Sequence, residues 1–251
     1  MIGSASGYAV LARQQTFPTS AKSPSGYSER PLVGTLRDLH GRPGLRLYLS
    51  SFRMGDDFDR LVEAVPRGAP IAVIANAVDF IAPEDRLAYT RTVFDPVEHF
   101  RSFGLSPYDL DLREYFDRSG ELENALTDTR VVWANGGNAF LLMRAMVQSG
   151  LDRILRERVA AGTLIYGGWS AGSVVAGPSL RGIELMDDPG VVVDGYVPEP
   201  FWDGLGLVDY SIVPHFQSAH PEAQAAARTV AWMTEKGLSF RALRDGEAII
   251  A

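Results

Sequence analysis

Beginning at Leu45, apolar runs of strand length alternate with stretches in which apolar residues recur at helical spacing. Residues 70–76 (PIAVIAN) form the clearest run, and a continuous apolar stretch of this length is typical of a strand covered on both faces. The pattern predicts strands at 45–50, 70–76, 108–112, 130–134, 163–166, 210–214 and 240–243. It predicts helices at 58–65, 83–103, 140–148, 151–161 and 221–236, and a further helix that begins directly after Ser170.

The regular alternation of strand and helix has a direct consequence for the fold. Strands joined by helices align in parallel, and the helices pack on both faces of the sheet. We therefore predict an α/β fold with a mostly parallel central sheet. The functional loops are expected at the carboxyl ends of its strands.

Composition divides the chain into two parts. Residues 1–40 are rich in Ser, Gly, Pro and Arg, and the first acidic residue is Glu29, so we predict an N-terminal extension there. Residues 41–251 are expected to form a single catalytic domain, because 251 residues with 46% hydrophobic content can build one sizeable core. Within this domain, the Gly-, Pro- and Asp-rich segment 181–206 is predicted to be an excursion or hairpin beside the site.

The segment 166–173 (YGGWSAGS) carries the main chemical signal. A predicted strand runs directly into Gly-x-Ser-x-Gly, the pattern that exposes a nucleophilic serine at the tip of a strand-to-helix turn. Such a turn requires flanking residues without bulk, which Gly168 and Gly172 provide. Ser170 is therefore the candidate nucleophile, and the N–H of Ala171 is a candidate donor to an oxyanion.

An activated serine needs a base, and the base needs a carboxylate that orients it. His215 follows the predicted strand 210–214, which we expect to end at the same sheet edge as the serine, so His215 is the candidate base. Asp245 follows the last predicted strand and is the candidate acid. The alternatives left open are His220 for the base and Glu184, Asp187 and Asp188 for the acid.

A second glycine-rich turn is expected beside this serine. Residues 135–138 (NGGN) close the predicted strand 130–134 and open a helix, so their backbone N–H groups point toward the same edge of the sheet. We therefore predict an oxyanion hole made by the amides of Gly137, Asn138 and Ala171.

Charge and composition remove several classes of function. The net charge of −7 and the pI near 5.1 argue against a nucleic-acid or anionic-membrane partner, since both require clustered Lys and Arg. No apolar run approaches the length of a membrane span, and the first residues lack a secretory pattern, so a cytoplasmic protein is expected. The absence of cysteine excludes disulfides and thiolate chemistry, and the four histidines lack a metal-binding spacing, so no metal or organic cofactor is expected.

Four dispersed signatures resemble the peptidase E and cyanophycinase family of serine peptidases. They are 136–138 (GGN) before a helix, 168–172 (GWSAG) followed by 176–178 (AGP), 214–216 (PHF) and 243–246 (LRDG). The resemblance covers most of the chain from about Leu45. It implies a three-layer α/β/α sandwich of the class I glutamine amidotransferase-like kind, with serine in place of cysteine. It also implies Ser170 as nucleophile, His215 as base and Asp245 as the third member.

The chain departs from the family in the stretch that follows the histidine loop. Family members that cleave dipeptides beginning with aspartate carry a Gly-Glu-Thr-Arg run, whose arginine supplies positive charge for the substrate. Here the equivalent stretch 222–228 (EAQAAAR) places alanine where that arginine falls, so this stretch does not predict aspartyl selectivity. The candidate substrate-binding residues are Arg181, His220 and Arg228.

These observations predict a dipeptidase E-like serine peptidase that hydrolyses short peptides through an acyl-enzyme. A small peptide is the expected partner, and a homodimer is left open. One alternative is an α/β-hydrolase-type esterase, whose chain order would require an acid between residues 170 and 215. The other is a non-catalytic module that holds an anionic ligand with its glycine-rich loops.

Overall fold

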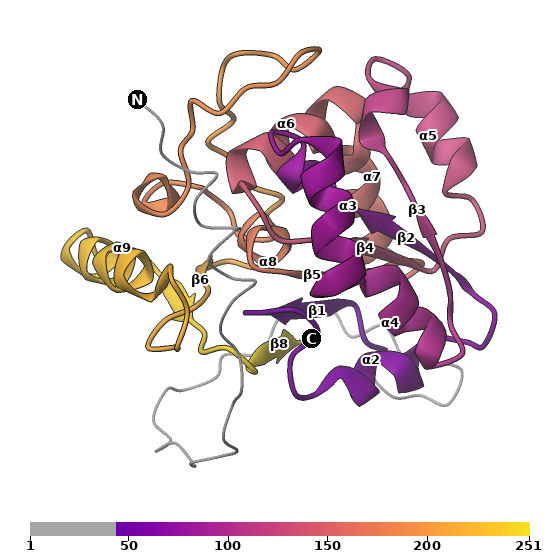
Figure 1. The fold of residues 1–251 in the computed structure, drawn as a ribbon, viewed down its shortest axis with the longest axis horizontal. Coiled ribbons are helices and arrows are strands. Elements are labelled where there is room, and N and C mark those ends of the chain that lie inside the picture. The colour runs from indigo at the N-terminus through magenta and orange to yellow at the C-terminus, as the bar shows by residue number, and fades with distance from the viewer. Residues whose placement is uncertain (1–43) are drawn as a thin grey trace. The chain divides into compact units, whose positions relative to one another are not determined.

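The structure, a computed structural model, describes residues 44–251, so the predicted extension 1–40 lies outside the described residues. Its main sheet has six strands in the order β3-β2-β4-β5-β1-β8. Five strands run parallel, and β8 pairs antiparallel with β1 at one edge (Figure 1). The strand bounds are β1 Leu47–Ser50, β2 Pro70–Ile74, β3 Ser106–Asp109, β4 Val131–Ala134, β5 Ile165–Trp169 and β8 Ala248–Ile250.

Helices cover both faces of this sheet. Alternate side chains of a strand point to opposite faces, and in β2 the side chains of Ile71 and Val73 join one core while those of Ala72 and Ile74 join the other. The first core contains α2 (Phe58–Ala64) and α4 (Pro96–Ser102), and the second contains α6 (Ala139–Ser149) and α7 (Leu151–Ala160). This arrangement is the expected α/β/α sandwich.

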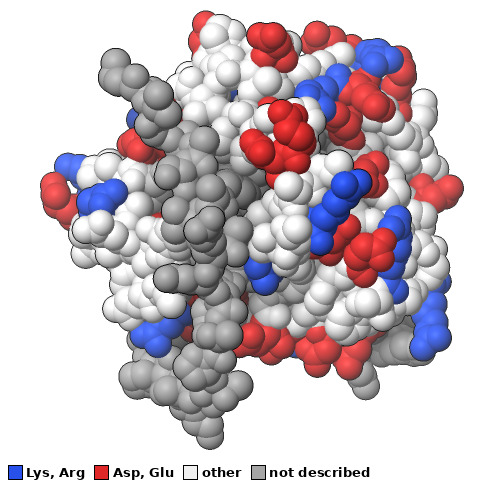
Figure 2. Space-filling model, in the orientation of Figure 1, with Lys and Arg blue, Asp and Glu red and all other residues white. Residues whose placement is uncertain are grey.

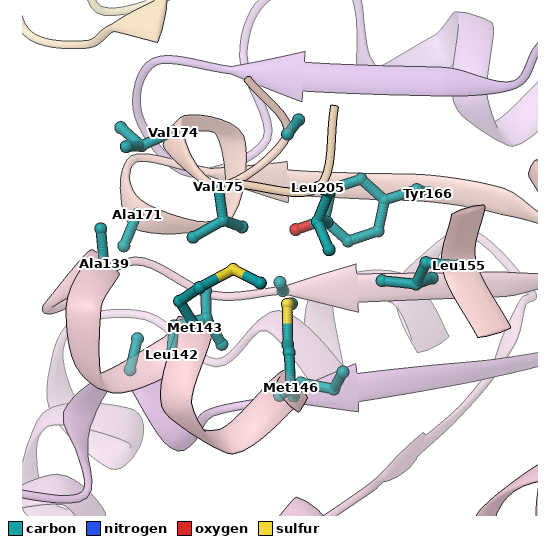
Figure 3. Close-up of a cluster of buried hydrophobic side chains, with 14 of the residues drawn as sticks. Ala139, Leu142, Met143, Met146, Leu155, Tyr166, Ala171, Val174, Val175 and Leu205 are labelled. Atoms are coloured by element: carbon teal, nitrogen blue, oxygen red, sulfur yellow. The ribbon is translucent and has the colours of Figure 1, made fainter. Parts of the chain in front are cut away.

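The second core packs directly beneath the predicted nucleophile turn. Figure 3 shows Leu142, Met143 and Met146 of α6 facing Tyr166 of β5 and Val175 near the turn. All of these side chains are buried. The turn therefore rests on close-packed apolar side chains, which limit its movement.

The predicted helix 83–103 is two helices, α3 (Pro83–Thr92) and α4. Pro96 explains the break, because proline lacks the N–H that would continue the first helix and restricts the residue before it. Asp95 then caps α4, where its side chain accepts a hydrogen bond from the N–H of Glu98 at 3.0 Å.

Three further elements differ from the sequence prediction. The strand expected at 108–112 is β3, and Leu112 begins the 3-10 helix η2 (Leu112–Tyr115) instead. The pattern did not predict α5 (Ser119–Ala125) or the edge strand β8. Both elements are short, and β8 forms by pairing with β1, a partner about 200 residues away along the chain.

The strands that precede His215 and Asp245 do not belong to the main sheet. These strands, β6 (Ser211–Val213) and β7 (Phe240–Ala242), pair in parallel as a separate two-stranded sheet. The expectation that all the candidate residues follow strands of one common sheet is therefore wrong. The helix α9 (Ala223–Glu235) connects the two strands, and the short helix α8 (Ala171–Val174) after Ser170 packs against β6.

Segment 181–206 is an irregular excursion, as expected, and contains one 3-10 turn, η3 (Ile183–Leu185). The buried guanidinium of Arg144 on α6 holds it by donating to the carbonyls of Pro189, Val191, Val197 and Pro198. The segment is thus tied to α6 along the helix, with further bonds at Asn138 and Gln148.

The surface charge and the helix lengths can be compared with the prediction of no nucleic-acid or membrane partner. Figure 2 shows that Lys and Arg lie among Asp and Glu on one face of the described residues, rather than forming one basic surface. None of the helices within residues 44–251 combines the length and the apolar character that crossing a bilayer requires.

Candidate active site

Ser170 lies between β5 and α8 in a strained backbone conformation, with φ of 50° and ψ of −116°. Such a conformation is rare for a residue with a side chain and is typical of a nucleophile turn. The two flanking glycines are required sterically. A Cβ on Gly168 would lie 2.7 Å from the carbonyl oxygen of Ala134, and a Cβ on Gly172 would lie 2.1 Å from the same atom.

Hydrogen bonds fix this turn against the neighbouring strand. The N–H of Ser170 donates to the carbonyls of Ser50 and Ser51, at 3.2 Å in each case. The hydroxyl of Ser173 donates to the carbonyls of Ser50 and Gly168, at 2.7 and 2.9 Å. The strained serine is thereby held at the carboxyl ends of β1 and β5.

The structure brings Ser170, His215 and Asp245 together, and we call these three residues the triad. The Nε2 atom of His215 lies 3.1 Å from the Ser170 hydroxyl oxygen, and its Nδ1 atom lies 2.7 Å from a carboxylate oxygen of Asp245. The His215 side chain is only 1% exposed. This geometry can move a proton from the hydroxyl to the imidazole while the carboxylate orients the ring.

The pKa of the Asp245 carboxyl supports an ionised acid. Burial alone would raise this pKa, but the hydrogen bond and the charge of His215, with a smaller contribution from His220, lower it below its ordinary value. Asp245 therefore carries its negative charge at neutral pH, and a charged carboxylate can stabilise an imidazolium at His215.

Ser51 joins the two sheets and was not found from the sequence. Its hydroxyl accepts a hydrogen bond from the N–H of His215 at 2.8 Å and lies 3.0 Å from a carboxylate oxygen of Asp245. Its carbonyl accepts the N–H of Ser170. A serine at the end of a strand carries no distinctive sequence pattern, so only the tertiary structure reveals this connection.

The structure places the two turns of the predicted oxyanion hole side by side, but one of the three predicted donors is already engaged. Strands β4 and β5 are neighbours, so the turn 135–138 lies beside the nucleophile turn. Within residues 44–251, the N–H groups of Gly137 and Ala171 have no hydrogen-bond acceptor. The N–H of Asn138 donates to the carbonyl of Ala77 at 2.8 Å, so the prediction of that amide as an oxyanion donor is wrong.

The side chain of Asn138 stabilises the local structure instead. Its side-chain oxygen accepts the N–H of Leu141 at 2.9 Å and so caps α6, while its side-chain amide donates to the carbonyl of Asp188 at 2.9 Å. Asn138 thus ties the glycine-rich turn to the excursion.

His220 packs on His215. The two imidazole rings stack with centroids 3.7 Å apart and planes inclined by 8°. The Nδ1 atom of His220 accepts the N–H of Glu222 at 3.2 Å, so this nitrogen is unprotonated. Burial, with the charge of His215, lowers the pKa of His220 to about 4, and a neutral ring therefore lies against the candidate base.

The geometry of His215, His220 and Asp245 does not favour a metal site. Ligand atoms of His215, His220 and Asp245 lie within 4.8 Å of one another. A metal ion binds in the plane of an imidazole ring, and two stacked parallel rings do not direct their lone pairs to one point. The donor set does not fit a metal ion unless one ring turns.

The alternative acids lie elsewhere. Asp187 accepts the N–H of Ala139 at 2.8 Å, and Glu184 accepts the N–H of Gly182. Burial, together with the charge of Glu222, raises the pKa of Asp187 to about 8. Neither carboxylate bonds to His215, so both are less suited to orient the imidazole than Asp245.

The two candidate arginines do not bond to the triad. Arg181 places its guanidinium 5.3 Å from the ring centre of Trp202, and Arg228 is exposed on α9. Of the three candidate substrate-binding residues, the structure brings only His220 into contact with the triad.

Known proteins are similar to this chain in sequence and in fold. Peptidase family S51 matches residues 83–251. An uncharacterised peptidase of Listeria monocytogenes is 33% identical over 117 residues, which make up 47% of this chain and 54% of that relative. Peptidase E of Shewanella putrefaciens is 29% identical over 172 residues, or 68% of this chain and 66% of that relative. The chain thus spans about half to two thirds of the length of these relatives.

Solved structures agree with the fold. A crystal structure of a candidate peptidase E from Listeria monocytogenes EGD-e superposes on this chain with a TM-score of 0.64 at 24% identity. The superposition covers 82% of this chain and 94% of the Listeria chain. A peptidase from an acI-B1 actinobacterium gives a TM-score of 0.58 at 14% identity, over 83% of this chain and 84% of that one. These likenesses show the α/β/α sandwich. Because the family match covers more than half of the sequence, the chain belongs to peptidase family S51.

Proposed function

We propose that this protein is a serine peptidase that hydrolyses short peptides, with dipeptides as the main substrates. The observation that carries the proposal is the continuous contact from the Ser170 hydroxyl through His215 to Asp245, at 3.1 and 2.7 Å. Membership of family S51 and the peptidase E relatives support the same reaction.

In the first half of the reaction, the Ser170 oxygen attacks the peptide carbonyl carbon and its proton passes to Nε2 of His215. The carbonyl oxygen becomes negative and accepts hydrogen bonds from the N–H groups of Gly137 and Ala171. The C–N bond then breaks, and the leaving amine takes the proton from His215. The product is an ester between the substrate's acyl group and Ser170.

In the second half, water attacks the ester carbonyl and gives a proton to His215. The C–O bond to Ser170 breaks, the serine oxygen recovers that proton, and the acid product leaves. Throughout, Asp245 holds the Nδ1–H of His215 and stabilises the imidazolium. Water is the only co-reactant, so this mechanism requires no cofactor.

The proposal keeps the cytoplasmic location expected from the sequence. Cell fractionation with an antibody against the chain tests it, and recovery in a secreted or membrane fraction would contradict it. A homodimer stays a prediction that sedimentation can test.

The function is tested with a library of dipeptides and tripeptides, read by mass spectrometry. We expect hydrolysis by the wild-type protein. Ser170→Ala is expected to lower kcat/KM by at least about 10³-fold with little change in Tm, because it removes the nucleophile and leaves the scaffold intact. Equal turnover by the two proteins would contradict the assignment of Ser170.

Two other results would favour the alternative functions. Hydrolysis of p-nitrophenyl esters without cleavage of any peptide would indicate an esterase. No hydrolysis of either substrate, together with no labelling of Ser170 by a fluorophosphonate probe, would indicate a non-catalytic binding module.

A further inference from the structure

Glu222 lies beside the reactive end of the triad, and neither the sequence patterns nor the mechanism above assigns it a role. One of its carboxylate oxygens is 3.8 Å from Nε2 of His215, the nitrogen that also faces Ser170. The side chain is 46% exposed, so it is open to a ligand from solvent. Its carboxylate accepts no hydrogen bond from any residue within 44–251.

The backbone beneath Glu222 is fixed. Its N–H donates to Nδ1 of His220, whose ring stacks on His215. The backbone that carries the carboxylate is therefore bonded to the stacked pair of rings beside the Ser170 hydroxyl. Such a connection positions a charged group relative to the reacting atoms.

Distances limit which part of a substrate can reach this carboxylate. The separations from Nε2 of His215 place the Glu222 oxygen no more than about 7 Å from the Ser170 oxygen. In a reactive complex the carbonyl carbon lies about 3 to 3.5 Å from the attacking oxygen. The α-nitrogen of the same residue is about 2.5 Å from that carbon. A charge-assisted hydrogen bond then spans a further 2.7 to 2.9 Å or so.

Along a bent path, these lengths bring the Glu222 oxygen within reach of the α-ammonium of the residue whose carbonyl is attacked. We propose that Glu222 binds this ammonium and so is the residue by which the site recognises a free amino terminus. The inference rests on the proposed peptidase function and adds the residue that selects for the amine.

The electrostatics of the site agree with binding of an ammonium group by Glu222. Burial raises the pKa of Glu222, and the charges that act on it are those of His215 and Asp245. No arginine or lysine of the described residues is among the groups that shift this pKa, and His215 is a cation only when it is protonated. With His215 neutral, a partly desolvated carboxylate is stabilised by a cation from a ligand. The same carboxylate would repel an acidic first side chain, in agreement with the missing family arginine.

The test compares two chromogenic substrates that differ only at the amine, alanine p-nitroanilide and N-acetyl-alanine p-nitroanilide. The measured quantity is the ratio of their kcat/KM values. We expect the wild-type protein to prefer the free amine and Glu222→Gln to lower the ratio at least tenfold. Glu222→Asp keeps the charge and should restore part of the preference.

Glu235→Gln is the matched control, because it makes the same change at an exposed carboxylate at the other end of α9. It should leave the ratio unchanged. Thermal melts of all variants show that each is folded.

Three results would overturn the inference. A ratio unchanged in Glu222→Gln means that the ammonium binds elsewhere. An equal loss on both substrates means that Glu222 acts through His215 and not on the amine. A wild-type protein that hydrolyses neither anilide nor any dipeptide contradicts the peptidase proposal itself, and so can be told apart from the first two results.

Discussion

The two sheets of this protein position the candidate catalytic groups by different means. The six-stranded sheet holds Ser170 in a turn where a Cβ on a flanking glycine would lie as close as 2.1 Å to a carbonyl oxygen. The two-stranded sheet of β6 and β7 holds His215 and Asp245 through hydrogen bonds, several of which involve the single hydroxyl of Ser51. Steric exclusion fixes the first group, and a polar network fixes the others.

The difference indicates whether a substitution in each region should reduce stability or activity. A steric constraint is local and appears in the sequence as glycine, but a polar network depends on residues from distant segments. Substitutions of the glycines that flank Ser170 should therefore act chiefly on stability. Substitutions at the junction with the small sheet should act chiefly on activity.

The largest effect is expected at the small sheet. Asp245→Asn keeps the size of the side chain but removes the charge that favours the required tautomer of His215, so kcat/KM should fall by about 10³- to 10⁴-fold. The matched variants Asp187→Asn and Glu184→Gln make similar changes at the alternative acids. Peptide hydrolysis assays on the three proteins measure kcat/KM. Full activity in Asp245→Asn would exclude Asp245 from the triad.

The main sheet is tested by Gly172→Ala. The added Cβ would lie 2.1 Å from the carbonyl oxygen of Ala134, so we expect a loss of stability of about 1–3 kcal/mol or more and a lower Tm. Gly120→Ala in α5 is the control, since nothing lies within 4 Å of its added Cβ. Equal Tm values for the two variants would show that the nucleophile turn adapts easily.

The junction between the sheets is tested by Ser51→Ala. The variant leaves the buried N–H of His215 without its acceptor and removes a contact with Asp245, so kcat should fall about tenfold with KM little changed. Ser102→Ala removes an exposed hydroxyl at the end of α4 and serves as the control. A larger rise in KM than fall in kcat would mean that Ser51 supports substrate binding instead.

The smallest effect concerns stability and pH at Asp187. Its pKa is about 8 in the folded protein and near 3.8 when exposed, so the folded state holds a proton that the unfolded state has lost between these values. This carboxyl therefore makes the fold less stable as the pH rises from about 4 to 8. Asp187→Asn removes that loss, so its Tm relative to wild type should rise steadily across the window. A difference that does not change with pH would contradict the raised pKa.

Much of the fold followed from local patterns. The continuous apolar run at 70–76 became β2, a strand of the parallel sheet with buried side chains on both faces. The apolar pattern joined α3 and α4 into one predicted helix, because it does not register the break before Pro96.

The sequence by itself determined the turn at Ser170, because glycine is the only residue that fits at Gly168 and Gly172. It also pointed to the three residues that the structure brings into contact, although it left alternatives open for the base and the acid. Tertiary structure alone decided that β6 and β7 form their own sheet, that Ser51 connects it to Ser170, and that His220 and Glu222 lie against His215. It also assigned the Asn138 N–H to Ala77 and not to an oxyanion. The physical reason is that steric needs are written in neighbouring residues, whereas hydrogen bonds and ring contacts between distant segments exist only after the chain has folded.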